Sequence, residues 1–146
     1  MAKTARDVMT SRPACCTPET SLEQVARLMV QHDCGEIPVI DSDELVVGVV
    51  TDRDIVCRMV AQGKNPLEYT AELCMSDPVV TVFETTTIVE ALATMEKHQV
   101  RRLPVVDDKG RCVGMISQSD LAWTGGEHQV AELVREISRD TGETSR

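Results

Sequence analysis

Aromatic side chains are scarce in this sequence, which contains one Tyr, one Phe and one Trp among its 146 residues. Proteins that bind single-stranded nucleic acid usually stack bases on aromatic side chains, so this scarcity argues against such a platform. The sequence also lacks an excess of positive charge, because its formal net charge is −9. An acidic chain argues against nucleic acid or an anionic membrane as a general partner. A small anionic ligand remains compatible with it, since a few local cations are enough to bind one.

Long apolar runs are absent too. No segment approaches the roughly 20 apolar residues that a membrane-spanning helix needs. The N-terminal residues MAKTARD contain no apolar segment of the kind found in a secretory signal peptide. We therefore expect a cytoplasmic protein, whose six cysteines are reduced in that compartment.

The cysteines follow no C-x-x-C pattern, which argues against a zinc site. Most of them are expected to be small buried apolar residues. The adjacent Cys15 and Cys16 with the nearby Cys34 leave a second interpretation open, in which the protein senses redox state or a metal. The sequence has no Ser-His-Asp or Cys-His arrangement, no P-loop and no G-x-G-x-x-G. These absences favour a protein that is not an enzyme.

The strongest pattern that is present is an internal repeat without gaps. The segment GEIPVID at 35–41 returns as RRLPVVD at 101–107, and GVVTDRDI at 48–55 returns as GMISQSDL at 114–121. The offset of 66 residues also relates Met9 to Met75. A copy of about 60 residues would be marginally stable alone, so we expect the two copies to pack on each other.

Each copy is predicted to form the same β-α-β-β-α unit. Helical periodicity and the N-terminal caps Ser21 and Thr87, followed three residues later by Gln24 and Glu90, predict the first helix of each copy. The predicted strands are 14–17, 38–40 and 46–50 in copy one, and 79–83, 104–106 and 112–116 in copy two. A second helix should follow each last strand, and in copy one it should run over 54–62 and end at Gly63.

These elements define the expected organisation of the chain. The first repeat covers 5–63, a short linker covers 64–72, and the second repeat covers 73–123. An additional amphipathic helix is expected over 127–138, followed by a flexible polar tail at 139–146. The predicted fold class is α/β, or α+β.

The tandem unit, with h-P-V-h-D followed by G-h-h-[T/S]-x-x-D in both copies, resembles the CBS-domain pair, also called the Bateman module. The resemblance covers about residues 5–123. It implies that the two repeats form a pseudo-two-fold pair with two clefts between the copies. It also implies a regulatory function, because in many members those clefts bind adenine nucleotides.

The first candidate site residues are Thr51 and Asp54 in copy one, with Ser117 and Asp120 in copy two. A hydroxyl and a carboxylate three residues apart at a strand-to-helix junction lie close together. The carboxylate can accept hydrogen bonds from both ribose hydroxyls, and the helix N-terminus favours phosphate. The resemblance assigns ribose and phosphate binding to these positions. The alternative is that the residues only cap the second helix.

The copies differ in the charges around these positions. Arg101 and Arg102 align with Gly35 and Glu36, and Arg53 aligns with Ser119. The resemblance implies that Arg101 and Arg102 reach the phosphates of a nucleotide held by Asp54, in a cleft that also contains Arg53. In the opposite cleft Glu36 would repel phosphate, and Arg12 would compensate for it only partly. We therefore predict a main cleft at Asp54 and a weaker one at Asp120, the alternative being that the arginines are solvated surface residues.

Aliphatic side chains should provide the walls for adenine. The resemblance places Pro78, Val79 and Val80 in the main cleft, and Pro13 and Ala14 in the weaker one. Val49 and Ile37 are further wall candidates. The alternative is that these residues are ordinary strand core.

Together these patterns predict a cytoplasmic regulatory protein that binds a nucleotide without catalysis and forms a homodimer. AMP, ADP and ATP are the first ligand candidates, followed by NAD and S-adenosylmethionine. An effector protein, which the sequence does not identify, would respond to the bound ligand. Two alternatives remain open: a ligand-free interaction or structural CBS protein, and a cysteine-based redox or metal sensor.

Overall fold

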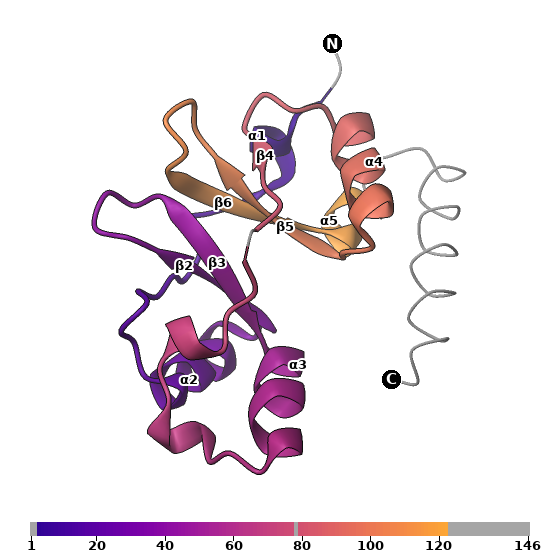
Figure 1. Cartoon of the computed structure of the whole chain (residues 1–146). Coiled ribbons are helices and arrows are strands. Elements are labelled where there is room, and N and C mark those ends of the chain that lie inside the picture. The colour runs from indigo at the N-terminus through magenta and orange to yellow at the C-terminus, as the bar shows by residue number, and fades with distance from the viewer. Residues whose placement is uncertain (1–2, 78, 123–146) are drawn as a thin grey trace. The chain divides into compact units, whose positions relative to one another are not determined.

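The computed structural model describes residues 3–77 and 79–122 of the chain. Pro78, the helix expected over 127–138 and the tail at 139–146 lie outside these residues. The chain forms two compact units. Unit 1 comprises Met1–Ser11, Val80–Asp107 and Val113–Arg146, and unit 2 comprises Arg12–Val79 and Asp108–Cys112. We describe each unit separately, over its described residues (Figure 1).

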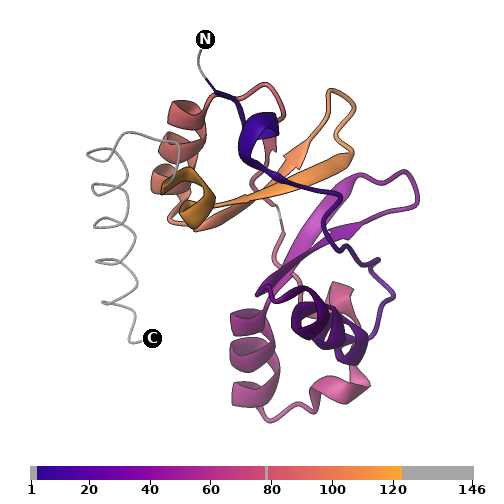
Figure 2. The same cartoon turned by 180° about the vertical axis from the view of Figure 1, so that it is seen from behind.

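Unit 2 contains an antiparallel hairpin and two helical segments. The hairpin pairs β2 (Glu36–Ile40) with β3 (Val46–Thr51), with Ile37 opposite Val50. Helices α2 (Leu22–His32) and α3 (Asp52–Asp54) lie together on one side of the hairpin, whose turn points away from them (Figures 1 and 2). The core of this unit consists of buried residues from α2, the hairpin and the segments that flank them: Cys16, Leu22, Val25, Met29, Ile37, Val39, Val50, Met59, Ala71 and Cys74.

Unit 1 contains a four-stranded sheet in the order β1-β6-β5-β4. These strands are β1 (Thr10–Ser11), β6 (Cys112–Ser117), β5 (Arg102–Val106) and β4 (Val82–Phe83), and the helices are α1 (Ala5–Val8), α4 (Ile88–His98) and α5 (Gln118–Ala122). Its buried core is formed by the residues equivalent to those of unit 2, among them Ile88, Ala91, Met95, Leu103, Val105, Ile116 and Leu121.

The two units exchange the first segments of the two repeats. Met9 belongs to the first repeat but packs on Gly114 in unit 1, and Met75 belongs to the second repeat but packs on Gly48 in unit 2. A Cβ atom at Gly48 would lie 2.7 Å from the Sδ of Met75, and one at Gly114 would lie even closer to Met9. Both glycines are therefore required by close packing, and the compact units divide the chain at Ser11–Arg12 and Val79–Val80 rather than at the ends of the repeats.

The first helix of each unit begins and ends at equivalent positions. Thr87 and Glu90 form the predicted capping box of α4, whereas at the start of α2 the structure shows only the bond from the Gln24 N–H to Ser21. Both helices end at a residue with left-handed backbone, Asp33 with φ 50° and Gln99 with φ 54°. The two predicted first helices are thus confirmed, one with half of its expected cap.

The predicted first strands are shorter than expected. Only Cys16 of the segment 14–17 forms a bridge, a parallel one with Val39, and β4 is confined to Val82–Phe83. Pro18 and Pro38 lack the N–H groups that would continue the ladder on either side of this bridge. The predicted strand over 14–17 was therefore wrong, although its chain position beside β2 is correct.

The second helix of unit 2 starts two residues earlier than predicted and is irregular. It begins as α3, continues through a π turn over Ile55–Met59 and ends in a 3₁₀ turn over Val60–Gln62. Gly63 ends it with φ 73°, a conformation that glycine adopts without steric cost. The predicted end of this helix is confirmed.

Candidate functional site

The junction between β3 and α3 holds Thr51 and Asp54 in a reciprocal pair of hydrogen bonds. The Asp54 N–H donates to the Thr51 Oγ1 at 2.9 Å, and the Thr51 N–H donates to the Asp54 Oδ2 at 2.9 Å. This arrangement is a capping box, which satisfies free N–H groups at the helix start. The predicted proximity of Thr51 and Asp54 is confirmed. The box also fixes the Asp54 carboxylate with one oxygen, Oδ1, directed away from the cap.

Arg58 and Ser76 approach this second oxygen. The Arg58 Nε lies 3.7 Å from Asp54 Oδ1, and the Ser76 hydroxyl donates to the same oxygen at 3.4 Å. Arg58 also donates to the Met75 carbonyl at 3.1 Å and to the Ser76 Oγ at 3.2 Å. The Asp54 side chain is 15% exposed and that of Arg58 is 50% exposed. A largely buried carboxylate is thus paired with a cation that remains half in solvent.

Sequence reasoning missed Arg58. The available signal was its spacing, because residues four apart on a helix are neighbours and Asp54 precedes Arg58 by four. The contacts with Met75 and Ser76 had no sequence signal, since those residues are 17 and 18 positions further along the chain.

Backbone pairing holds the Met75–Ser76 segment beside this junction. The Ser76 N–H donates to the Val49 carbonyl at 2.9 Å, and the Val49 N–H donates back at 3.2 Å. The Asp52 N–H donates to the Gly35 carbonyl at 3.0 Å, which ties the start of the helix to the start of β2. The Asp54 corner, defined here as Thr51, Asp54, Arg58 and Ser76, is therefore built on rigid elements of unit 2.

Unit 1 repeats the junction with different surroundings. The Ser117 N–H donates to the Asp120 Oδ2 at 2.9 Å, and the Asp120 N–H donates to the Ser117 Oγ at 3.2 Å. The Gln118 N–H donates to the Arg101 carbonyl at 2.8 Å, as Asp52 does to Gly35. The predicted pair Ser117 and Asp120 is confirmed as a juxtaposition, and we call it the Asp120 corner.

The other predicted site residues are divided between the units. Unit 2 carries Arg53, Val79, Pro13 and Ala14, and unit 1 carries Val80, Arg101 and Arg102. The side chains of Arg53, Arg101 and Arg102 are exposed, and the four apolar residues are partly buried. Pro78 lies outside the described residues, and the assignment of all these residues to a ligand stays a prediction.

The additional wall candidates and the charged residues near the corners differ in how far they are buried. Ile37 has no exposed surface and packs in the core of unit 2, so its interpretation as strand core is the correct one. Val49 is partly buried. Glu36 is partly buried, and Arg12 is exposed with a left-handed backbone of φ 52°.

The thiols divide into buried and partly exposed groups. Cys16 and Cys74 are buried, while Cys15, Cys34, Cys57 and Cys112 are partly exposed. Burial raises the pKa of Cys16 to about 11, and burial together with the nearby Asp54 carboxylate raises the pKa of Cys74. These two thiols are therefore protonated at neutral pH and poorly reactive.

The described residues contain no metal-binding cluster and no membrane-spanning helix. Over residues 3–77 and 79–122, no group of three or more His, Cys, Asp or Glu side chains is arranged to hold a metal ion. His32 and His98 are exposed at the equivalent ends of α2 and α4. None of the described helices is long and apolar enough to cross a membrane.

The duplicated junction agrees with comparisons to known proteins. The family model for the CBS domain matches residues 5–61 and 71–123. The chain belongs to the CBS-domain family. It is 37% identical over 134 residues to Hypoxic response protein 1 of Mycobacterium tuberculosis, covering 92% of this chain and 93% of the relative. The predicted family and the α/β fold class are therefore confirmed.

Solved structures of CBS proteins resemble the chain over most of its length. The crystal structure of Hypoxic Response Protein I with two coordinated zinc ions has a TM-score of 0.76 at 36% identity, covering 85% of this chain and all of the other. The CBS domain pair of MJ0100, in complex with 5′-methylthioadenosine and S-adenosyl-L-methionine, has a TM-score of 0.76 at 26% identity, covering 84% and 95%. CBSX2 in complex with AMP has a TM-score of 0.72 at 25% identity, covering 83% and 94%.

Proposed function

We propose that this CBS protein binds an adenosine-containing ligand at the Asp54 corner and acts as a regulatory sensor without catalysis. The observation that carries the proposal is the reciprocal hydrogen-bonded box at Thr51 and Asp54, repeated at Ser117 and Asp120. The ligands of MJ0100 and CBSX2 support it, because both contain adenosine. AMP, ADP and ATP are the first candidates, and S-adenosylmethionine and NAD follow.

The unequal contacts of the two Asp54 oxygens indicate how a ribose would bind. Oδ2 accepts a 2.9 Å bond from the Thr51 backbone, which the ligand would leave in place. The contacts of Oδ1 at 3.4 and 3.7 Å are longer than good hydrogen bonds, which fall near 2.7–3.2 Å. A ribose hydroxyl that donates to Oδ1 would therefore replace weak contacts with a stronger one.

Phosphate binding would use the cations around the same corner. Arg53 is exposed at the start of α3, where its guanidinium is proposed to contact a phosphate. Arg58 offsets the charge of Asp54 and so reduces its repulsion of a phosphate. Arg101 and Arg102, which the family resemblance assigns to phosphate binding, are proposed as further ligand residues. Binding would shift the population of two conformations or assembly states, and an effector protein would distinguish these states. The size of the shift is set by how much more tightly the ligand binds one state than the other.

Isothermal titration of the purified chain with AMP, ADP, ATP and S-adenosylmethionine tests the proposal. We expect one dominant site per chain. Asp54→Ala should weaken it at least tenfold, and Arg102→Ala should also weaken it, while Asp120→Ala should leave it nearly unchanged. Absence of binding by every one of these ligands at millimolar concentration would refute the proposed function.

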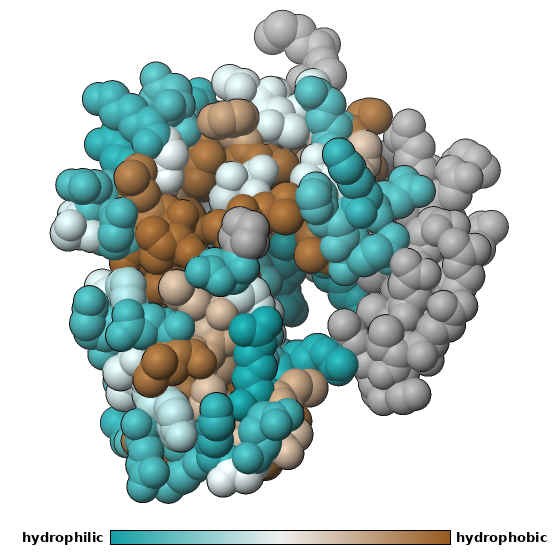
Figure 3. Space-filling view, viewed as in Figure 1, coloured by the Kyte–Doolittle hydropathy of each residue, from teal (hydrophilic) through white to brown (hydrophobic). Residues whose placement is uncertain are grey.

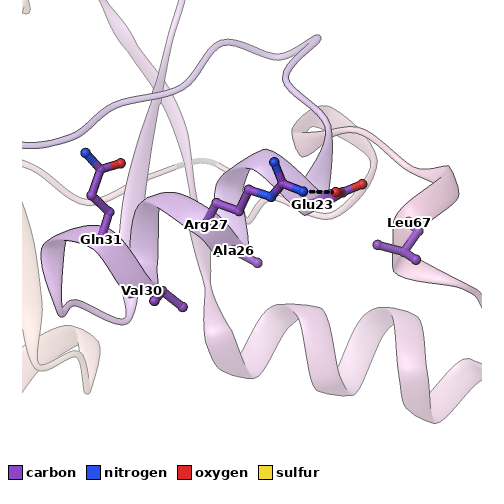
Figure 4. Close-up of a pocket in the computed structure, with 6 residues that line it drawn as sticks. All are labelled: Glu23, Ala26, Arg27, Val30, Gln31 and Leu67. Carbon is purple, nitrogen blue, oxygen red and sulfur yellow. Dashed lines mark hydrogen bonds and ion pairs between the residues drawn. The ribbon is translucent and has the colours of Figure 1, made fainter.

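A second candidate function, a ligand-free interaction protein, is favoured by an apolar groove on unit 2. The groove of about 380 Å³ lies between α2 and the 3₁₀ turn Pro66–Glu68, where Val30 is 83% exposed and Leu67 is 63% exposed (Figure 4). Figure 3 shows other apolar residues among polar ones on the visible face of unit 2. Exposed apolar surface of this kind commonly contacts another protein, and the predicted homodimer would provide one.

Thermal shift distinguishes the two functions. A ligand present at 100 times its dissociation constant stabilises the folded state by about 2.7 kcal/mol. A nucleotide sensor should therefore show a raised unfolding temperature with at least one adenosine compound. Val30→Lys should change the assembly state measured by sedimentation without changing nucleotide affinity, if the groove serves association alone.

A further inference from the structure

Cys112 lies beside the turn of the β2–β3 hairpin, although 60 or more residues separate them in sequence. The Cys112 N–H donates to the Glu44 carbonyl at 3.1 Å, and the adjacent Arg111 forms an antiparallel bridge with Leu45. Residues Asp108–Cys112 accordingly belong to unit 2 rather than to the unit that holds the rest of β6. The backbone thus fixes Cys112 at the turn end of the hairpin.

Cys15 lies beside the other strand of the hairpin, β2. Its neighbour Cys16 donates its N–H to the Pro38 carbonyl at 3.0 Å and accepts from the Ile40 N–H at 2.8 Å. Across the hairpin, the Asp41 N–H donates to the Leu45 carbonyl at 3.0 Å, so the residues that follow Ile40 lie beside Leu45. These bonds place Cys15 beside β2 and Cys112 beside the hairpin turn, both within unit 2.

The side chains of these two cysteines are in hydrogen-bonding contact. The Cys15 thiol also donates to the Pro13 carbonyl at 3.4 Å. Both residues are partly exposed, unlike the buried Cys16 and Cys74. Small oxidants can therefore reach a pair of sulfur atoms that are already adjacent.

We propose that Cys15 and Cys112 are a redox modification site that forms a reversible intramolecular disulfide when the protein meets a peroxide. The trio suggested by sequence, Cys15, Cys16 and Cys34, is thereby replaced by a different pair. Cys16 points into the core and Cys34 packs against the same core, so neither is arranged as a partner for Cys15. Sequence spacing gave no indication of Cys112.

The proposed reaction has two steps and starts at Cys112. The hydrogen bond with Cys112, together with burial, raises the pKa of Cys15, so this thiol keeps its proton and acts second. The Cys112 thiolate attacks hydrogen peroxide, breaks the O–O bond and becomes a sulfenic acid, and the released hydroxide takes up a proton to form water. The Cys15 sulfur loses its proton and attacks the sulfenic sulfur, forming the S–S bond and releasing a second water. Two thiols are oxidised and one peroxide is reduced.

Peptide mapping of the oxidised chain tests this site directly. The purified full chain is treated with hydrogen peroxide, alkylated without reduction and digested with trypsin, which places Cys15 in peptide 7–27 and Cys112 in peptide 112–135. We expect these two peptides to be joined by a disulfide, and fragment ions to place the bond at Cys15 rather than Cys16. Two of the six titratable thiols should be lost. Dithiothreitol should restore both thiols. A linkage of Cys112 to any other cysteine, or oxidation that leaves both peptides unlinked, would overturn the proposal.

Controls separate this disulfide from other oxidation products. Mixing ¹⁵N-labelled with unlabelled chain before oxidation should give only all-heavy and all-light linked peptides, and mixed pairs would show an intermolecular bond instead. Cys15→Ser and Cys112→Ser should each abolish the linked peptide, while the matched variant Cys57→Ser, also at a partly exposed thiol, should retain it. Mapping of the unaltered chain decides the question even if a variant fails to fold. The result is independent of nucleotide binding.

Discussion

The Asp54 corner and the Asp120 corner share a backbone design but differ in the charges around it. Both carboxylates close a box with a hydroxyl at the end of the last strand. The first N–H of each helix donates to the carbonyl of the residue just before the first strand of the hairpin, Gly35 or Arg101. At the position that Arg53 has in unit 2, unit 1 has Ser119, and at that of Ser76 it has Thr10. What the copies share is what the fold requires, whereas the charges that differ are candidates for ligand selection.

Other repeated contacts support this division. The Ala5 N–H donates to the Thr86 carbonyl as the Ala71 N–H does to the Thr20 carbonyl, both at 2.8 Å. Each bond joins the opening turn of one repeat to the start of the long helix of the other. Such pairs recur with the offset of the repeat and contain no charged side chain, so they are explained by folding alone.

The largest expected change in stability comes from adding a Cβ atom at Gly48 or Gly114, where neighbouring atoms leave no room for it. The new Cβ of Gly48→Ala would meet Met75 at 2.7 Å and the Ser76 carbonyl at 3.0 Å. Overpacking of this kind costs about 1–3 kcal/mol. We expect Gly48→Ala and the matched Gly114→Ala to destabilise the chain by similar amounts in urea unfolding. Only Gly48→Ala should also weaken nucleotide binding, because it displaces Ser76; equal effects of both variants on binding would contradict the assigned asymmetry.

Removing the carboxylate of each corner in turn separates ligand binding from helix capping. Hydrogen bonds to a charged group contribute about 1.5–3 kcal/mol, so Asp54→Ala should lower nucleotide affinity by at least tenfold. Asp120→Ala removes the equivalent helix cap and should lower stability by about 1 kcal/mol, with little effect on the dominant binding site. Titration calorimetry and urea unfolding of both variants give the two quantities. Binding lost with Asp120→Ala but kept with Asp54→Ala would reverse the predicted order of the sites.

Arg58 should have a smaller effect, because its side chain is half exposed. Exposed ion pairs contribute about 0.2–1 kcal/mol, so Arg58→Ala should lower the free energy of unfolding by no more than about 1 kcal/mol. Without this cation the Asp54 carboxylate repels phosphate more strongly. We expect affinity for AMP to fall roughly two- to fivefold and affinity for uncharged adenosine to fall less. Arg58→Lys, which keeps the charge, should restore most of the AMP affinity; equal losses for AMP and adenosine would exclude the electrostatic role.

Sequence predicted most of the fold because local rules dominate there. The caps at Thr51 and Thr87, the helical stripe ending near Met95 and the turn at Gly63 depend on neighbours within a few residues. The repeat then supplied the equivalence of Asp54 and Asp120. It did not predict which unit Met9 and Met75 would join, because two copies of one motif offer each segment two equivalent docking positions.

The remaining features depend on contacts that sequence spacing does not encode. The bonds from Arg58 to Met75 and Ser76, and the meeting of Cys15 with Cys112, require backbone pairing between distant segments. The strand predicted over 14–17 was wrong for a reason visible in the sequence, since Pro18 and Pro38 have no N–H group to donate to the ladder. That prediction relied on the apolar pattern and ignored the prolines, whereas in the structure the strand is limited to a single bridge at Cys16.

The smallest expected effect is on the free energy of unfolding at acidic pH, and here too the two copies differ. The α4 cap uses Glu90, whose carboxylate accepts from the Thr87 hydroxyl at 2.8 Å and the Thr87 N–H at 3.1 Å, whereas α2 has the uncharged Gln24 at the equivalent position. These bonds, the side-chain one first, hold the pKa of Glu90 below its usual value of 4.5. Because the folded pKa is the lower one, the stabilisation is complete above the unfolded pKa and is lost as pH falls through the folded pKa.

Glu90→Gln should therefore reduce the loss of stability between about pH 5 and pH 3 while leaving the pH dependence above 5 unchanged. Asp7 in unit 1 has a pKa lowered mainly by its backbone bond from Thr4, so Asp7→Asn should act in the same direction. Gln24→Glu introduces the titrating cap into α2 and should add an acid-dependent loss. Thermal unfolding of the four proteins at stepped pH measures all of this, and identical acid profiles would show that the caps differ in chemistry but not in their contribution to stability.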